Sequence, residues 1–231
     1  MNKYSKMQED SYEYEASYWS VDNRNPVVGT FDAHNAWSDY DVYLFKNIDT
    51  TNLTALEFGC GPGRNIVRFN KRFSKIDGVD IAQKNLDNAK LWMSHNNIDP
   101  NTSILYKNNG STIDIVPSDS YDIVYSTICF QHICVHSIRY SLLEDFYRVL
   151  KSGGSICFQQ GFGNSHPRTV GYFENFFDAP GTNSLMDHRL ENIDDLKNDL
   201  EKIGFNSFEY DIRPVGPGDG HTNWIFWRAK K

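Results

Sequence analysis

Long hydrophobic runs, cysteines and clustered basic side chains are all scarce in this sequence of 231 residues. A membrane-spanning helix needs about 18 or more consecutive apolar residues. No stretch of the chain is that long, so we expect no membrane partner. The N-terminal segment MNKYSKMQEDSYEYEASYW is polar and lacks the apolar core of a secretory signal peptide. We therefore expect a cytoplasmic protein.

The charge balance argues against nucleic acid as a partner. Asp and Glu number 30 against 23 Lys and Arg, which gives a net charge of -7. Neutralising a phosphate backbone requires clustered basic side chains, whereas the basic groupings here are isolated pairs such as Lys71-Arg72. We expect these pairs to lie on a solvated surface.

The cysteines give no sign of a metal site. The four are scattered along the chain, none forms a CxxC pair, and no His/Cys spacing resembles a zinc site. We expect reduced thiols and no metal. The residues are Cys60, Cys129, Cys134 and Cys157.

From residue 54 onward, short apolar runs alternate with helical patterns, which is typical of a parallel sheet with crossover helices. The predicted strands span 54–60, 75–81, 103–107, 121–130, 155–162, 207–213 and 223–229. The predicted helices span 64–73, 82–96, 138–150 and 193–203. The last two strands flank the turn-rich RPVGPGDGH and form a predicted antiparallel hairpin. The pattern therefore predicts an α/β fold with a seven-stranded, mostly parallel sheet.

A glycine-rich loop follows the first predicted strand in LEFGCGPGRN. Glycine permits unusual backbone angles and removes the Cβ that would block a ligand, and ligands of open parallel sheets bind at the carboxyl ends of strands. Arg64 stands where a dinucleotide fingerprint needs glycine, and the GK[ST] of a phosphate-binding P-loop is missing. Asp80 ends the second strand, where its carboxylate can accept hydrogen bonds from both hydroxyls of a ribose.

Four blocks together resemble one enzyme family. LEFGCGPGRN, GVDI, NNGSTIDIVPSDSYDIVYSTICFQHI and LLEDFYRVLKSGG follow the motif series of the class I S-adenosylmethionine-dependent methyltransferases, in order and with similar spacing, over residues 54 to 162. The chain is most similar to the small-molecule, type 11-like members. The resemblance implies S-adenosyl-L-methionine as cofactor and a Rossmann-like, doubly wound sheet whose last strand is antiparallel.

The resemblance also implies which residues hold the cofactor. Asp80 would hold the ribose hydroxyls with Ile81 beside the adenine, and Ser126 would lie near the sulfonium. An N-terminal cap would close over the cofactor and bring Tyr18 or Trp37 into contact with ligand. The implied cofactor-binding residues are Gly59, Cys60, Gly61, Gly63, Asp80, Ile81, Asn109, Gly110, Ser126 and Thr127.

We interpret residues 1–231 as a single methyltransferase domain built in four parts. The first 50 residues, rich in Tyr, Trp and Asp, form an N-terminal helical cap. A cofactor-binding core follows over residues 51–162. Residues 163–190 lack clear periodicity and form an inserted lid after the fifth strand. A C-terminal helix and hairpin occupy residues 191–231.

The methyl acceptor is less well defined by sequence. The fourth strand lacks the [ND]PP[YF] signature of adenine- and glutamine-directed relatives, and Ile128 and Gln131 replace the carboxylates of a metal-binding E-x-x-E-H. Methylating a hydroxyl requires removal of its proton, and histidine is the usual base near neutral pH. Three histidines follow strands at the carboxyl edge and are the candidate catalytic residues, namely His132, His166 and His221.

The resulting hypothesis is O-methylation of a polar small molecule, such as a sugar or nucleotide-linked sugar of a bacterial surface polysaccharide or capsule. Gln159, Gln160 and Arg168 favour a polar acceptor pocket. Two alternatives remain open, an N-methyltransferase acting on an amine or amino sugar and a non-catalytic cofactor-binding protein. We expect a small-molecule acceptor as partner, no nucleic acid, and a monomer or homodimer.

Overall fold

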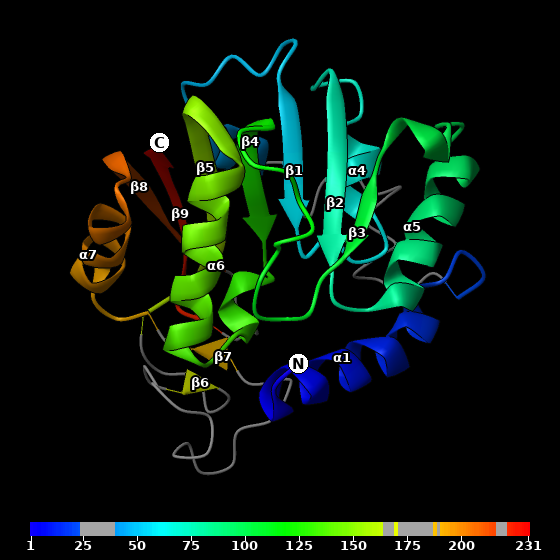
Figure 1. The fold of residues 1–231 in the computed structure, drawn as a ribbon, viewed down its shortest axis with the longest axis horizontal. Coiled ribbons are helices and arrows are strands. Elements are labelled where there is room, and N and C mark those ends of the chain that lie inside the picture. Colours follow the sequence, from blue (N-terminus) through cyan, green and yellow to red (C-terminus); the bar gives the residue numbers. More distant parts are fainter. Residues whose placement is uncertain (24–39, 164–168, 171–186, 189, 216–220) are drawn as a thin grey trace.

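The computed structural model describes residues 1–23, 40–163, 169–170, 187–188, 190–215 and 221–231. Its central feature is a seven-stranded sheet in the order β3-β2-β1-β4-β5-β9-β8 (Figure 1). Strands β1 to β5 are mutually parallel, while β9 runs antiparallel to both neighbours. The strands are β1 (Thr54–Phe58), β2 (Lys75–Asp80), β3 (Leu105–Lys107), β4 (Tyr121–Thr127), β5 (Leu150–Phe162), β8 (Asn206–Pro214) and β9 (Asn223–Lys230).

Helices cover both faces of this sheet. One face packs against α3 (Tyr40–Leu44), α4 (Arg64–Phe69) and α5 (Gln83–His95) through a core cluster that contains Phe45 and Tyr125. The other face packs against α6 (His136–Val149) and α7 (Ile193–Ile203). Strands β1, β4 and β5 are buried on both faces, which explains their nearly continuous apolar sequences. The predicted α/β fold with its antiparallel last strand is confirmed.

Element boundaries depart most from the sequence prediction at two places. Helix α4 ends at Phe69 rather than residue 73. Strand β5 begins at Leu150 rather than residue 155, so the glycine pair at 153–154 lies within it. There the pairing of β4 and β5 shifts register between Tyr121 and Ile123, and Gly153 has φ +78°, which glycine tolerates in a bulge.

The N-terminal helix α1 (Lys3–Glu15) runs along the carboxyl ends of the strands (Figure 1). One end is held by Tyr4, whose hydroxyl donates to the carbonyl of His132 (2.9 Å) and accepts from the amide of Cys134 (2.8 Å). At the other end the Glu13 carboxylate accepts from the amide of Gln83 at the start of α5, a helix without a side-chain cap of its own. The helix is therefore fixed at both ends across the sheet edge.

Smaller elements complete the described chain. They are the 3₁₀ turns η1 (Ala16–Trp19), η2 (Pro100–Thr102) and η3 (Phe130–His132), and a two-stranded pair of β6 (Thr169–Val170) and β7 (Asp187–His188). Most of the predicted lid over residues 163–190 lies outside the described residues, as do His166, Arg168 and Trp37.

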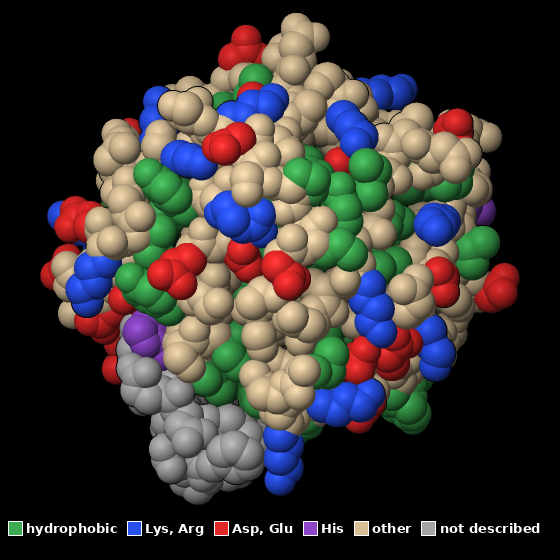
Figure 2. Space-filling view, in the orientation of Figure 1, with side chains coloured by type: hydrophobic (Ala, Val, Ile, Leu, Met, Phe, Trp, Pro, Cys, Tyr) green, Lys and Arg blue, Asp and Glu red, His purple; other side chains and the backbone are tan. Residues whose placement is uncertain are grey.

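The surface mixes charges of both signs. On the face seen in Figure 2, acidic and basic side chains are interspersed, and the described basic residues gather into no broad patch there. None of the helices in the described part of the chain has the length and apolarity needed to cross a bilayer.

Candidate functional site

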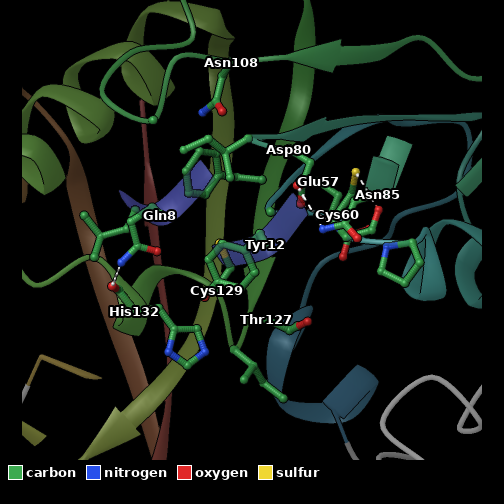
Figure 3. A pocket seen from close by; sticks show the side chains of 18 of the residues that line it. Gln8, Tyr12, Glu57, Cys60, Asp80, Asn85, Asn108, Thr127, Cys129 and His132 are labelled. Atoms are coloured by element: carbon green, nitrogen blue, oxygen red, sulfur yellow. Dashed lines mark hydrogen bonds between the residues drawn. The ribbon is translucent and has the colours of Figure 1, made fainter. Parts of the chain in front are cut away.

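A cavity of about 490 Å³ lies between the carboxyl ends of the strands and α1 (Figure 3). The glycine loop after β1, the end of β2 and the start of α5 form one wall. Residues at the end of β4 and in the loops after β3 and β4 form a second wall. Side chains of α1 and η1 form the third wall. Its volume lies within the usual range of small-molecule sites, about 300–1,000 Å³.

The glycine loop meets this cavity with bare backbone. Gly59 has φ +67°, and a Cβ there would lie 2.0 Å from Cys129 Sγ. Gly61 has φ +51° and no atom within 4 Å of an added Cβ, so its open side faces the cavity it lines. Gly63 has φ +81°, but a Cβ there would lie 2.9 Å from Cβ of Ala89. Gly63 thus permits close packing of the loop on α5 and is not part of the cavity wall.

Asp80 organises the loop from below. Its Oδ2 accepts from the amide of Gly61 (2.8 Å), and its Oδ1 accepts from the amide of Ala82 (2.9 Å) and from Asn85 Nδ2 (3.2 Å). Burial raises the pKa of Asp80, and these three donors partly oppose the rise. Because a carboxylate has about four acceptor positions, one remains toward the cavity.

Glu57 is a second buried carboxyl in the same wall. Its side chain accepts from Asn65 Nδ2 (2.7 Å) and from the hydroxyl of Tyr125 (3.3 Å). Burial raises the pKa of Glu57 to about 8. Asn65 also donates to Thr127 Oγ1 (2.8 Å), which joins the ends of β1 and β4 through one side chain.

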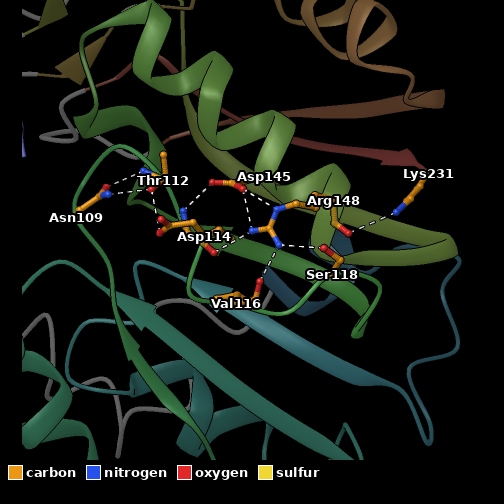
Figure 4. A network of polar contacts seen from close by, with 9 residues as sticks. Asn109, Thr112, Asp114, Val116, Ser118, Asp145, Arg148 and Lys231 are labelled. Atoms are coloured by element: carbon orange, nitrogen blue, oxygen red, sulfur yellow. Dashed lines mark hydrogen bonds and ion pairs between the residues drawn. The ribbon is translucent and has the colours of Figure 1, made fainter.

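The loop after β3 presents Asn108 and Gly110 to the cavity, with Ile81 beside Gly110. The Oδ1 atom of Asn108 is buried and has no hydrogen-bond partner among the described residues. Asn109 turns away instead. Its Oδ1 accepts from the amides of Ser111 and Thr112, both at 2.8 Å, within a polar network that extends to Asp145 and Arg148 (Figure 4).

The end of β4 forms the floor beside the glycine loop. Thr127, Ile128 and Cys129 line the cavity, while Ser126 is fully buried and donates to the carbonyl of Phe58 (2.8 Å). Ile128 has φ +60°, a strained conformation for a β-branched residue. Its amide donates to both the backbone oxygen (3.3 Å) and Oε1 (2.9 Å) of Gln159, which holds the strained residue in place.

Of the described histidines, His132 is the one that lines the cavity. Its backbone carbonyl accepts from Tyr4 and from Gln8 Nε2 (3.2 Å), so α1 fixes its position. Glu15, from the end of α1, lines the same cavity. Burial raises the pKa of Glu15, and the electrostatic influence of His132 opposes that rise.

The other predicted acceptor-site residues lie elsewhere. His221 packs against Gly161 and Trp224, and its Nε2 lies 3.3 Å from Nε2 of Gln131; His221 is not part of the cavity wall. Gln159 and Gln160 are buried in β5 and do not line the cavity either. The described part of the chain contains no group of three or more potential metal ligands.

The sequence prediction expected an N-terminal cap over the cofactor but missed the side chains of α1 and η1 that line the cavity. Five side chains of α1 and η1 line the cavity at spacings of three or four, which puts them on one helical face. That spacing is visible in the sequence and could have identified them. They are Tyr4, Gln8, Tyr12, Glu15 and Trp19. Tyr18, the predicted contact, is exposed.

Comparison with known proteins identifies the domain. Residues 55–154 match the family described as "Methyltransferase domain". Over those residues the match confirms the predicted S-adenosylmethionine-dependent methyltransferase domain and its cofactor, and the strand order confirms the Rossmann-like fold.

Solved structures share the fold at low identity. Phosphoethanolamine N-methyltransferase 2 of Haemonchus contortus, in complex with phosphomonomethylethanolamine and S-adenosylhomocysteine, is 18% identical, with a TM-score of 0.67 over 100% of this chain and 60% of that one. A Mesorhizobium loti S-adenosylmethionine-dependent methyltransferase is 17% identical, with a TM-score of 0.62 over 87% of this chain and 100% of that one.

Two similar proteins are named for a cycloaddition rather than for methyl transfer. The S-adenosyl-L-methionine-dependent Diels-Alderase iccD of Talaromyces variabilis is 27% identical over 99 residues, 43% of this chain, which spans about a third (33%) of that protein. The [4+2]-cyclase SpnF gives a TM-score of 0.59 at 14% identity, over 78% of this chain and 76% of that one.

The residues present fit S-adenosylmethionine. Asp80 retains an acceptor position toward the cavity, and the buried Oδ1 of Asn108 lacks a donor from the described residues. Ribose hydroxyls and the adenine amino group are donors of the kind these oxygens need. Gly61 leaves open space where another residue would place a Cβ.

Proposed function

We propose that the protein transfers a methyl group from S-adenosylmethionine to a hydroxyl of a small polar molecule, such as a sugar or nucleotide-linked sugar. One observation carries the proposal. His132 lies in the wall of the same cavity as Asp80 and the glycine loop, which puts a base within the site that holds the methyl donor.

The chain's residues have distinct roles in this proposal. Bound S-adenosylmethionine supplies a methyl group on a positively charged sulfur, which a nucleophile attacks in line. Asp80 holds the ribose and Asn108 the adenine. The α1 side chains keep water out of the reacting space.

His132 receives the proton of the acceptor hydroxyl as the oxygen–methyl bond forms and the sulfur–methyl bond breaks. The products are a methyl ether, neutral S-adenosylhomocysteine and a protonated His132. Glu15 brings a carboxylate to the same cavity, where that positive charge forms. General-base assistance of this kind contributes about 10²–10⁴-fold to the rate.

The test is release of S-adenosylhomocysteine from purified protein with a panel of hydroxylated and amine acceptors. For a hydroxyl acceptor, His132→Asn is expected to lower kcat about 100-fold or more, because the general base is lost. His221→Asn, which changes a histidine outside the cavity wall, is the matched comparison and is expected to have a small effect. A larger loss with His221→Asn would assign the base to His221 instead.

A second candidate is N-methylation of an amine or amino sugar. It is favoured by the carboxylate of Glu15 in the cavity and by the similarity to a phosphoethanolamine N-methyltransferase along the whole chain. A neutral amine needs little help from a base, so His132→Asn would then reduce turnover only slightly. If S-adenosylmethionine binds but no acceptor is methylated, a non-catalytic or ring-forming role replaces both candidates.

A further inference from the structure

The C-terminal part of α1 and the following η1 present one carboxylate and two aromatic rings to the cavity. Tyr12, Glu15 and Trp19 are spaced by three and four residues, and all three line the cavity and are half-buried. The rings of Tyr12 and Trp19 lie 6.3 Å apart between centroids and are tilted by 34° to each other. Glu15 stands between them in sequence, one helical turn from each.

Glu15 differs from the other acidic residues of α1. Glu9 pairs with Lys6 and Lys107, and Glu13 accepts from the backbone of α5. No ion pair or hydrogen bond from the described residues reaches the Glu15 carboxylate, although it is half-buried. Burying a carboxylate without an ion pair or hydrogen bond costs free energy unless a ligand supplies the partner.

The geometry points to a site for an organic cation, a sulfonium or ammonium group, formed by Glu15 with the rings of Tyr12 and Trp19. A carboxylate supplies the opposite charge, and aromatic faces attract cations that carry methyl groups. This inference rests on the proposed function, because the cavity is the one that takes the methyl donor. It adds that the third wall recognises positive charge.

Two ligands can bring that charge. S-adenosylmethionine carries a sulfonium and an α-ammonium group, and an amine acceptor carries its own ammonium group. S-adenosylhomocysteine keeps the α-ammonium group but lacks the sulfonium charge, and methylthioadenosine lacks both. These three compounds separate the sources by charge while keeping the adenosine part constant.

The experiment is calorimetric titration of wild type and Glu15→Gln with these three compounds, and with tetramethylammonium chloride in the presence of S-adenosylhomocysteine. Glu15→Gln keeps the size of the side chain and removes its charge. Glu13→Gln is the matched control, because it changes a carboxylate of the same helix that contacts α5. Tyr12→Leu is a second variant that removes one ring.

A tenfold or greater loss in Glu15→Gln for S-adenosylmethionine alone assigns the sulfonium to the site. The same loss for S-adenosylmethionine and S-adenosylhomocysteine, with methylthioadenosine unchanged, assigns the α-ammonium group. Loss of tetramethylammonium binding alone assigns an acceptor's ammonium group. In each supporting case Tyr12→Leu weakens binding of the same compounds as Glu15→Gln. Glu13→Gln changes the binding of charged and uncharged compounds equally.

Equal weakening of all three nucleosides shows a packing role for Glu15 and overturns the inference. Unchanged binding of every compound overturns it as well. A wild-type protein that binds none of the nucleosides contradicts the proposed function itself, so the two failures are distinguishable.

Discussion

Two buried carboxyls, Glu57 and Asp80, face the same cavity but are stabilised differently. Asp80 accepts two backbone amides and one side-chain amide, which suit an ionised carboxylate. Glu57 accepts from Asn65 and Tyr125, and burial raises its pKa to about 8. At neutral pH the free protein therefore holds Glu57 mainly in its protonated form.

Glu57 makes the stability of the free protein depend on pH. Its pKa is about 8 in the folded chain against an ordinary 4.5, so the folded state binds the extra proton between these values. Its contribution to stability is complete below about pH 4.5 and is lost as the pH rises through about 8. Gln at position 57 does not titrate, so the free energy of unfolding of Glu57→Gln relative to wild type is expected to be higher at pH 8.5 than at pH 5.5. Urea denaturation at the two pH values measures this difference. An unchanged difference at the two pH values would contradict the assignment.

At the scale of elements, the glycines of the loop after β1 serve two purposes. Gly59 and Gly63 allow close packing, and Gly61 faces the cavity. Gly59 is blocked by Cys129 and Gly63 by Ala89, whereas Gly61 meets open cavity. All three have positive φ, which costs any other residue about 1–2 kcal/mol. Each position should therefore respond differently to an added methyl group.

Gly63→Ala is expected to lower the melting temperature, because its Cβ meets α5, while cofactor binding changes little in the folded fraction. Gly61→Ala is expected to cost only the conformational term, about 1–2 kcal/mol, and to weaken cofactor binding by protruding into the cavity. Thermal melts and calorimetric titration of the two variants separate the effects. The opposite ranking would place the cofactor contact at Gly63 rather than at Gly61.

Tyr4 holds helix α1 over the cavity, and removing its hydroxyl oxygen alone tests this contact. The hydroxyl of Tyr4 bonds the carbonyl of His132 and the amide of Cys134, so Tyr4→Phe leaves both without that partner. Leaving a buried polar group unpaired costs about 1–3 kcal/mol. We expect a loss of that size in urea denaturation and faster amide exchange in residues 3–15. If exchange in α1 stays as in wild type, the helix is held mainly by its other contacts.

The sheet and its helices could be predicted because their signals are local. Helix α7 begins and ends as predicted, with Asn192 accepting from the amide of Asp194 as its N-cap and Gly204 following it. The wall formed by α1 could not be placed in the same way, because its contacts join residues over a hundred positions apart, such as Tyr4 and Cys134. The choice of Asn108 over Asn109 depends on which side chain enters a distant network around Arg148.

The roles of the histidines also depend on contacts between residues far apart in the sequence. His132 and His221 both lie at the carboxyl edge, as predicted from the strands they follow or precede. Only the packing of α1 on His132, and of Gly161 against His221, separates a residue of the cavity from one beside it. His166 lies outside the described residues and stays a prediction.

At the scale of the whole molecule, the central claim is that the cavity beneath α1 binds S-adenosylmethionine through Asp80 and the glycine loop. The most direct measurement is calorimetric titration of wild type, Asp80→Ala and Asp87→Asn with S-adenosylmethionine. Asp87 lies on α5 outside the cavity and accepts from Gln83 Nε2, so it is the matched control. We expect wild type and Asp87→Asn to bind alike, and Asp80→Ala to bind at least about tenfold more weakly, since it loses charge-assisted hydrogen bonds. Equal binding by Asp80→Ala and wild type, with all variants folded, would contradict the account.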